Sequence, residues 1–388
     1  MQKTWWILPL LWLLLQSCMT TRIERLQKEL DAFCKEAVPD KRVDFCRVSV
    51  KKGTGNRLML KGELLSPELK KKILKLAQSR QTAVTDSIIL LPERSVSGKP
   101  WGLVTLSVAN LKTEPSHGSE MASQAIMGTP VRILKADDDW LFVQTPDHYL
   151  AWVGSSSVQT MDQQELEQWR KSERVFFPGN YGLVYKDTVD FGIVSDLVAG
   201  SILVKTADCG SYCQVSLPDH RTGFIPGKQV ISFDQWKNRD QTTGEKLVDT
   251  AKKFLGLPYM WGGTSSKAVD CSGFMKNVWF LNGIILERDA SQQFKHGQEI
   301  DPGMNFENLQ PGDMMFFGKK QPVRIIHTGL YIGNREVIHS SGRVRINSMD
   351  PQRANYSRYL GGTFVGARRV IGQPAQFGIM PVKEHPWY

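Results

Sequence analysis

Two segments of the chain repeat one another, and this repeat limits the possible folds more than any other feature. Gly128-Thr-Pro-Val-Arg-Ile-Leu and Pro146-Asp147-His148 recur 72 residues later as Gly200-Ser-Ile-Leu-Val-Lys-Thr and Pro218-Asp219-His220. Each unit contains short β-rich runs separated by turn residues, which is typical of a small barrel. The repeat therefore predicts two consecutive small β-barrels.

The paired Pro-Asp-His runs invite a metal-binding or catalytic interpretation of His148 and His220. A loop at the same place in two barrels is more simply a hairpin turn, so we assign these histidines no role. No second cluster of Cys or His has the spacing of metal ligands. We therefore expect neither a metal nor a cofactor.

A second pattern places a thiol at the start of a helix. Apolar residues recur with helical spacing from Phe274 to Leu281, Asp270 is suited to the N-cap, and Gly283 is suited to end the helix. Cys271 then lies in the first turn, where the helix dipole favours a thiolate. We expect the pKa of Cys271 to fall from about 8.5 to between about 3.5 and 7.5. The alternative is a small buried structural cysteine.

Two histidines, His327 and His339, lie downstream of this helix on two apolar runs that are joined around Gly333-Asn334. This pattern is typical of a β-hairpin. If the turn centres on Gly333, His327 and His339 lie directly opposite each other on one face. Acyl transfer needs a nucleophile, a base and a group that orients the base. We expect Cys271, His327 and His339 to take these roles in that order.

Four motifs resemble the NlpC-type cysteine peptidases of bacterial cell walls. They are Pro258-Tyr-Met-Trp-Gly-Gly, Asp270-Cys-Ser-Gly-Phe, Leu309-Gln-Pro-Gly-Asp-Met-Met-Phe-Phe and His327-Thr-Gly-Leu-Tyr-Ile-Gly. The similarity covers residues of about 240 to 372, and the two repeat units resemble bacterial SH3-like domains. It implies an α+β multidomain fold, in which a papain-like catalytic domain follows two SH3-like barrels and a short α/β N-terminal region. It also implies Cys271, His327 and His339 as a catalytic triad.

Within that family, the arrangement of two SH3-like domains ahead of the catalytic domain resembles the γ-D-glutamyl-L-diamino-acid endopeptidases, the dipeptidyl-peptidase six subgroup. The resemblance implies hydrolysis of the γ-D-glutamyl bond in murein stem peptides that have a free N-terminal L-Ala. In that subgroup, acidic and tyrosyl side chains bind the L-Ala ammonium. The positions that match the substrate pocket are Glu114, Tyr149, Tyr259, Asp270, Ser272, Asp289 and Ala290.

Simpler roles remain open for several of these residues. The simpler role of Glu114 is an exposed loop acid, that of Tyr149 is an edge aromatic, and that of Tyr259 is a core residue. As part of the site, Tyr259 would lend its hydroxyl to an oxyanion beside the backbone N–H of Cys271. Two other functions remain open as well. One is a non-catalytic wall-binding lipoprotein, and the other is an endopeptidase that acts on intact, glycan-linked stems.

The first eighteen residues have the features of an export signal. They carry one cation, Lys3, then an apolar run, and Leu15-Gln-Ser-Cys18 resembles a bacterial lipobox. We expect a lipidated Cys18, a membrane anchor and an address in the cell envelope, on the periplasmic or outer-membrane face. An uncleaved anchor is the alternative.

Four cysteines remain after Cys18 and Cys271, an even number for an oxidising compartment. We expect Cys34–Cys46 and Cys209–Cys213 disulfides, with four reduced, buried cysteines as the alternative.

Composition and charge add only broad limits. The 388 residues carry a net charge of +10, which suits anionic partners such as cell-wall polymers or membrane surfaces. The basic residues are dispersed and no nucleic-acid motif is present, so we expect no nucleic-acid partner, and we expect a monomer. The expected domains are the signal at 1–18, an N-terminal cap region at 19–80, the barrels at 81–160 and 165–235, the peptidase domain at 240–372 and an irregular tail at 373–388.

Overall fold

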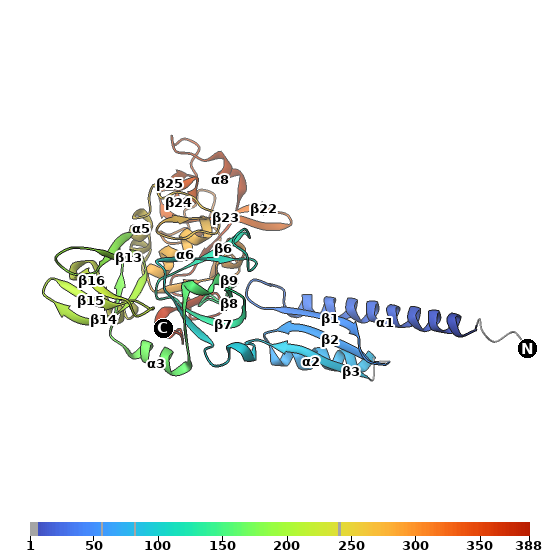
Figure 1. Ribbon diagram of the computed structural model, residues 1–388. Coiled ribbons are helices and arrows are strands. Elements are labelled where there is room, and N and C mark those ends of the chain that lie inside the picture. The colour runs from blue at the N-terminus through green and yellow to red at the C-terminus, as the bar shows by residue number, and fades with distance from the viewer. Residues whose placement is uncertain (1–6, 56, 81–82, 240–241) are drawn as a thin grey trace, which may run out of the picture. The chain divides into compact units, whose positions relative to one another are not determined.

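The computed structural model describes residues 7–55, 57–80, 83–239 and 242–388, and the chain forms two compact units, residues 1–97 and 98–388 (Figure 1). Cys18 falls in the first helix. The side chains of residues 7–19 are outside the described part of the structure, so the lipidation expected at Cys18 is not tested by it. Among the described residues, no helix is both long and apolar enough to cross a membrane.

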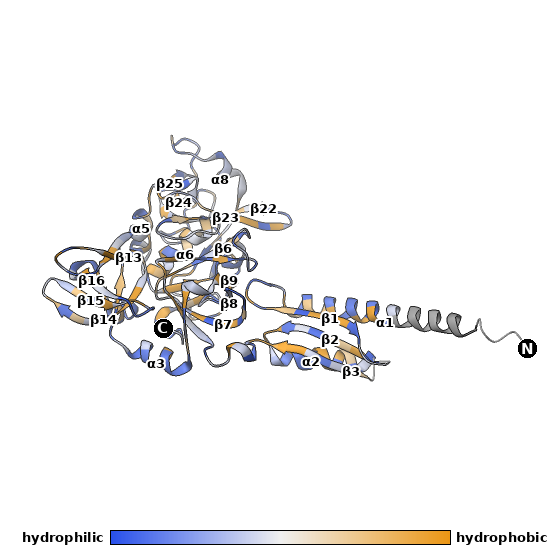
Figure 2. Ribbon diagram, in the orientation of Figure 1, coloured by the Kyte–Doolittle hydropathy of each residue, from blue (hydrophilic) through white to orange (hydrophobic). Residues whose placement is uncertain are grey.

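The first unit is a three-stranded sheet with two helices packed against one face. Alternate residues of its first two strands are buried with the apolar faces of both helices, around Leu30, Leu60 and Ile73. Figure 2 shows this alternation as hydrophobic positions along the strands. The elements are α1 (Ile7–Ala37), β1 (Cys46–Lys52), β2 (Leu58–Leu64), α2 (Pro67–Arg80) and β3 (Val84–Leu90).

This sheet extends beyond residue 80, where sequence analysis ends the N-terminal region. β3 pairs in parallel with β2 after the α2 crossover, so the chain leaves the first unit only near Ser97. A disulfide between Cys34 and Cys46 joins α1 to the start of β1, as the sequence predicts.

The second unit begins with the two repeats, each folded as a seven-stranded antiparallel sheet. The first repeat unit has the strand order β10-β4-β7-β8-β9-β5-β6 and the second has β13-β12-β16-β15-β14-β11-β17. The first contains β4 (Trp101–Val104), β5 (Val108–Lys112), β6 (Met121–Ile126), β7 (Pro130–Asp137), β8 (Trp140–Gln144), β9 (Leu150–Gly154) and β10 (Val158–Met161). The second contains β11 (Arg174–Phe177), β12 (Tyr181–Tyr185), β13 (Ile193–Val198), β14 (Ser201–Cys209), β15 (Tyr212–Ser216), β16 (Thr222–Pro226) and β17 (Ile231–Ser232).

The sequence repeat is also a structural repeat. β8 and β15 begin and end 72 residues apart, and so do β9 and β16. His148 and His220 both adopt a left-handed conformation, with φ of 64° and 66°, in the turns that follow β8 and β15. Helix α3 (Gln163–Lys171) joins the first repeat unit to the second, and its start is fixed by a capping box between Asp162 and Glu165.

The expected Cys209–Cys213 disulfide is absent, and both thiols are free. The two cysteines flank the turn between β14 and β15, but Cys209 pairs with Tyr212 and Asp208 pairs with Cys213. Since paired residues share a face and neighbours along a strand alternate, the two sulfur atoms lie on opposite faces of the hairpin. The expectation was wrong by one residue of register.

The rest of the second unit is a six-stranded antiparallel sheet, in the order β21-β26-β22-β23-β24-β25, with the buried helix α6 packed against β23. Its helices are α4 (Phe233–Lys237), α5 (Gly244–Lys252), α6 (Cys271–Leu281), α7 (Ala290–Gln293) and α8 (Arg358–Thr363). Its main strands are β21 (Gln298–Ile300), β22 (Met314–Lys320), β23 (Val323–Gly333), β24 (Glu336–Ser341), β25 (Arg343–Ser348) and β26 (Phe364–Arg369), and its short strands are β18 (Thr264–Ser265), β19 (Ala268–Val269), β20 (Ile284–Leu286) and β27 (Ile379–Pro381).

One hydrophobic core runs through the second unit and fixes the repeats against the six-stranded sheet. It contains Leu103 of the first repeat unit, Phe176 of the second and Phe274 of α6. The C-terminal segment also joins it, because β27 pairs with β20 and Tyr388 is buried. The expectation of an irregular tail at 373–388 was therefore wrong for its last ten residues.

Candidate active site

Cys271 is the first residue of α6 and is buried. Asp270 is the N-cap, and its carboxylate accepts a hydrogen bond of 2.7 Å from the backbone N–H of Gly273. Gly273 allows a close approach here, because a Cβ at this position would lie 2.0 Å from the carbonyl oxygen of Gly263. The cap and the glycine together press the start of α6 against the Pro258–Gly263 segment.

The environment of Cys271 differs from the expected thiolate site. Burial and the charge of Asp270 raise the pKa of Cys271 to about 11, against smaller lowering effects of the Thr328 backbone and Arg288. Burial and then His339 lower the pKa of His327 to about 3. Near neutral pH the thiol keeps its proton and His327 is an uncharged base. The expectation of a lowered thiol pKa was wrong because desolvation outweighs the helix dipole.

The two histidines share one face of the β23–β24 hairpin, but they are not directly opposite each other. Leu330 pairs with Ile338 and Tyr331 with Val337, so the same register places Gly329 opposite His339. His327 is therefore the diagonal neighbour of His339. Its Nε2 lies 2.8 Å from Nδ1 of His339, across the space that Gly329 leaves open.

A hydrogen-bond chain behind the histidines determines their tautomers. Asn347 donates through Nδ2 to the carbonyl oxygen of Asn355 at 2.8 Å, so its Oδ1 accepts from Nε2 of His339 at 3.0 Å. Nδ1 of His339 then accepts from Nε2–H of His327, which leaves a lone pair on Nδ1 of His327. Sequence analysis missed Asn347, because a single asparagine on the next strand carries no signal of its own.

Gly329 is required by this packing. A Cβ at Gly329 would lie 2.7 Å from Cγ2 of Val337 and 2.9 Å from Cβ of His339. We expect Gly329→Ala to displace His339 and lower kcat by about tenfold or more, because a shifted orienting group misplaces the base. Gly362→Ala is the matched control, since nothing lies within 4 Å of a Cβ there. Equal kcat values in both variants and the parent enzyme would contradict this account.

Arg288 is the second residue that sequence analysis missed, and it is completely buried. Its guanidinium pairs with the carboxylate of Asp270 and donates to Oγ of Ser272 at 2.9 Å. It also donates to Oγ of Ser123 on β6, at 3.0 Å. Burial lowers the pKa of Arg288, but the charge and hydrogen bonds of Asp270, together with the nearby Asp289 and Tyr149, outweigh it and raise that pKa. The guanidinium thus links the nucleophile's N-cap to the first repeat unit.

The first repeat unit contacts the start of α7. The hydroxyl of Tyr149 donates to Oδ2 of Asp289 at 3.4 Å, although 140 residues separate them in the chain. Glu114 lies exposed in the loop between β5 and β6. From the same loop, Glu120 accepts a hydrogen bond of 2.7 Å from Nε1 of the exposed Trp261.

The remaining pocket candidates lie around the nucleophile. Tyr259 is half-buried, and its pKa is raised to about 12 by burial and by its proximity to Cys271. Ser272 and Ala290 are buried in the first turns of α6 and α7. Among the described residues, no group of three or more His, Cys, Asp or Glu side chains has an arrangement that would hold a metal ion.

Comparisons with known proteins agree with this geometry. Residues 256–366 match the NlpC/P60 family and residues 111–158 match the bacterial dipeptidyl-peptidase Sh3 domain. The gamma-D-glutamyl-L-lysine dipeptidyl-peptidase of Bacillus cereus is 27% identical over 273 residues, which are 66% of this chain and 77% of that protein.

The probable endopeptidase NlpC homolog of Haemophilus influenzae is 33% identical over 158 residues, which are 39% of this chain and 74% of that protein. A crystal structure of an NlpC/P60 family protein from Bacillus cereus superimposes with a TM-score of 0.60 at 21% identity, covering 70% of this chain and 99% of that one. The buried cysteine at a helix start, the paired histidines and these similarities lead to one conclusion: the chain belongs to the NlpC/P60 family of cysteine peptidases.

Proposed function

We propose that the protein hydrolyses the bond between γ-D-glutamate and the diamino acid in murein stem peptides that begin with a free L-Ala. The observation that carries this proposal is the contact between Tyr149 of the first repeat unit and Asp289 of the catalytic domain. A carboxylate at this wall suits a substrate that ends in an ammonium group close to the scissile bond. The name of the Bacillus cereus relative specifies the corresponding bond before lysine.

The proposed reaction begins at Cys271. Nδ1 of His327 takes the thiol proton while the sulfur attacks the γ-carbonyl carbon of D-glutamate, so proton transfer and attack occur together in a neutral pair. The backbone N–H of Cys271 and the hydroxyl of Tyr259 stabilise the resulting oxyanion. Collapse breaks the C–N bond, and His327 returns the proton to the leaving amine. Water, deprotonated by His327, then hydrolyses the thioester and restores the thiol.

The proposed specificity depends on charge. The L-Ala ammonium would contact Asp289 and Tyr149, with Glu114 closing the pocket from its loop. Asp270 and Ser272 are already bonded to Arg288, so they support the pocket from behind, and Ala290 leaves room beside Asp289. An N-acylated stem offers no cation, so it would gain no charge-assisted hydrogen bond from Asp289.

The two rival functions differ from this one in what they require. A non-catalytic wall-binding protein does not require the Cys271–His327–His339–Asn347 arrangement. An endopeptidase acting on glycan-linked stems does not require a carboxylate at the acyl side of the pocket. Stem peptides with a free and with an acetylated N-terminus separate them: we expect kcat/KM to favour the free peptide by about a hundredfold. Equal values would support the intact-wall endopeptidase, and no cleavage of either would support the binding protein.

We further propose that the second repeat unit is a second SH3-like domain and that the catalytic domain is papain-like. The shared strand boundaries and turn geometry of the two repeats support the first point. We also propose a monomer held at the cell envelope by a lipid on Cys18. Intact-mass analysis of membrane-extracted protein tests the anchor, and an unmodified soluble chain would contradict it.

A further inference from the structure

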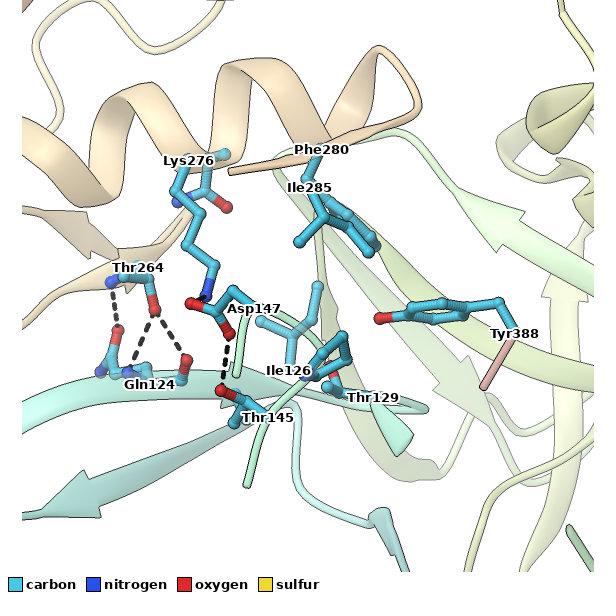
Figure 3. A pocket seen from close by; sticks show the side chains of 13 residues that line it. Gln124, Ile126, Thr129, Thr145, Asp147, Thr264, Lys276, Phe280, Ile285 and Tyr388 are labelled. Carbon is cyan, nitrogen blue, oxygen red and sulfur yellow. Dashed lines mark hydrogen bonds and ion pairs between the residues drawn. The ribbon is translucent and has the colours of Figure 1, made fainter. Parts of the chain in front are cut away.

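The loop that carries Tyr149 is held to the catalytic domain at two more positions. The carboxylate of Asp147 forms an ion pair with Nζ of Lys276 on α6, and its other oxygen accepts from Oγ1 of Thr145 at 2.6 Å. The carbonyl oxygen of Pro146 lies 3.0 Å from Nε2 of His385 in the C-terminal segment. Figure 3 shows Lys276 extending from α6 to the Asp147 carboxylate, with Thr145 on the other side.

The ion pair joins a buried carboxylate to a partly buried ammonium group. The Asp147 side chain is 1% exposed and that of Lys276 is 19% exposed. Burial alone would raise the pKa of Asp147, but the charge and hydrogen bond of Lys276 outweigh it and hold that pKa below its ordinary value. Removing Lys276 alone would leave the buried Asp147 carboxylate without its cation, so the two residues hold their elements together as one unit.

The second repeat unit shows that the turn itself does not need this ion pair. In both loops the backbone N–H of the third residue of the Pro-Asp-His run closes a hydrogen bond, from His148 to Thr145 at 2.8 Å and from His220 to Leu217 at 2.9 Å. In the second loop, however, Asp219 pairs within the loop, with Arg221, and both side chains are partly exposed. The turn forms in either setting, and the ion pair of the first loop reaches another domain, whereas that of the second stays within its own loop.

We propose that Lys276 is a positioning residue, which sets Tyr149 relative to the nucleophile and so determines recognition of the substrate's N-terminus. Lys276 lies on the same helix as Cys271, five residues further along. Through Asp147 it holds the loop that carries Tyr149, which lies two residues after Asp147. The hydroxyl of Tyr149 contacts Asp289. One helix thereby fixes both the attacking sulfur and one wall of the pocket. This inference rests on the proposed function, because it assigns Tyr149 to the pocket.

The test compares four variants of the full-length protein with the parent. Lys276→Met removes the charge at similar length, and Lys276→Arg restores it. The double variant Asp147→Asn/Lys276→Met removes both charges, so that no carboxylate remains buried alone and the protein folds even if Lys276→Met does not. Arg221→Met is the matched control, because it removes the corresponding ion pair of the second repeat unit.

We expect Lys276→Met and the double variant to raise KM for the free stem peptide by about tenfold, with kcat changed by less than about threefold. The preference for free over acetylated stems should fall by a similar factor, and backbone amides of residues 147–149 should exchange faster with solvent. Lys276→Arg should recover most of the preference, and Arg221→Met should behave as the parent.

An unchanged KM, preference and amide exchange in the double variant would overturn the inference, and so would equal effects of Arg221→Met. A parent enzyme without preference for the free N-terminus would instead refute the proposed function. In that case KM for the stem peptide and the amide exchange still decide whether Lys276 positions the loop.

Discussion

Replacing Cys271 with alanine should reduce hydrolysis of stem peptides by several orders of magnitude, because in the proposed mechanism its sulfur attacks the acyl carbon. Cys213→Ala is the matched control, since Cys213 is also a buried free cysteine but lies in the second repeat unit. Initial rates with both variants give the comparison. Hydrolysis by Cys271→Ala at the rate of the parent would show that the thiol mechanism is wrong.

His327→Ala should lower the rate of hydrolysis by about as much as Cys271→Ala. The double variant Cys271→Ala/His327→Ala should lower it no further, because nucleophile and base act as one unit. His339→Ala should lower the rate less, since His339 acts through His327.

The neutral pair of Cys271 and His327 also determines how activity responds to pH. With the pKa of His327 lowered to about 3 and that of Cys271 raised to about 11, neither group should titrate in the free enzyme between about pH 5 and 8. Alkylation of Cys271 should therefore be slower at neutral pH than that of an ordinary thiol.

Asp289→Asn should lower kcat/KM for the free stem peptide by about a hundredfold and leave the acetylated stem almost unaffected. The reason is that the carboxylate attracts the substrate's ammonium, and an acetylated N-terminus has no charge to lose. Tyr149→Phe removes the hydroxyl that contacts Asp289 and should act in the same direction with a smaller effect. Both substrates must be measured, because only their ratio separates recognition from a general loss of activity.

Glu114→Gln in the same assay tests the role that the family resemblance gives to Glu114. Glu120→Gln is its control, because Glu120 comes from the same loop but bonds to Trp261. If Asp289→Asn and Tyr149→Phe both leave the ratio of kcat/KM between the free and the acetylated stem unchanged, these residues do not recognise the N-terminus.

Local patterns in the sequence were sufficient to place the nucleophile and both histidines. Helical spacing after Asp270 located Cys271 at a helix start, and the alternation of two strands placed His327 and His339 on one face. Their register was predicted two residues away from the observed one. Gly333, Asn334 and Arg335 all adopt left-handed conformations, and the ladder is irregular between Tyr331 and Gly333. Because Gly333 pairs with Glu336, the turn is centred between Asn334 and Arg335 and not on Gly333, and a turn centre assumed from one glycine cannot reveal this.

The residues that the sequence did not reveal act over long distances in the chain. Arg288 bonds to Ser123, 165 residues away, and Lys276 pairs with Asp147, 129 residues away. Charged residues are usually exposed, so nothing in the local pattern marks Arg288 and Asp147 as buried. The direction of the thiol pKa was missed for the same reason, because it depends on burial by segments distant in sequence. Composition and spacing describe each element, whereas these contacts depend on how the elements pack.

Mass spectrometry of the products from one substrate tests the central claim most directly. The substrate is an unmodified stem peptide with L-Ala at its N-terminus, followed by γ-linked D-glutamate and a diamino acid. The account predicts that the parent enzyme releases the L-Ala-γ-D-Glu dipeptide and a fragment beginning with the diamino acid, and that Cys271→Ala releases neither. Cleavage at a different bond, or preferential cleavage of glycan-linked stems, would contradict it.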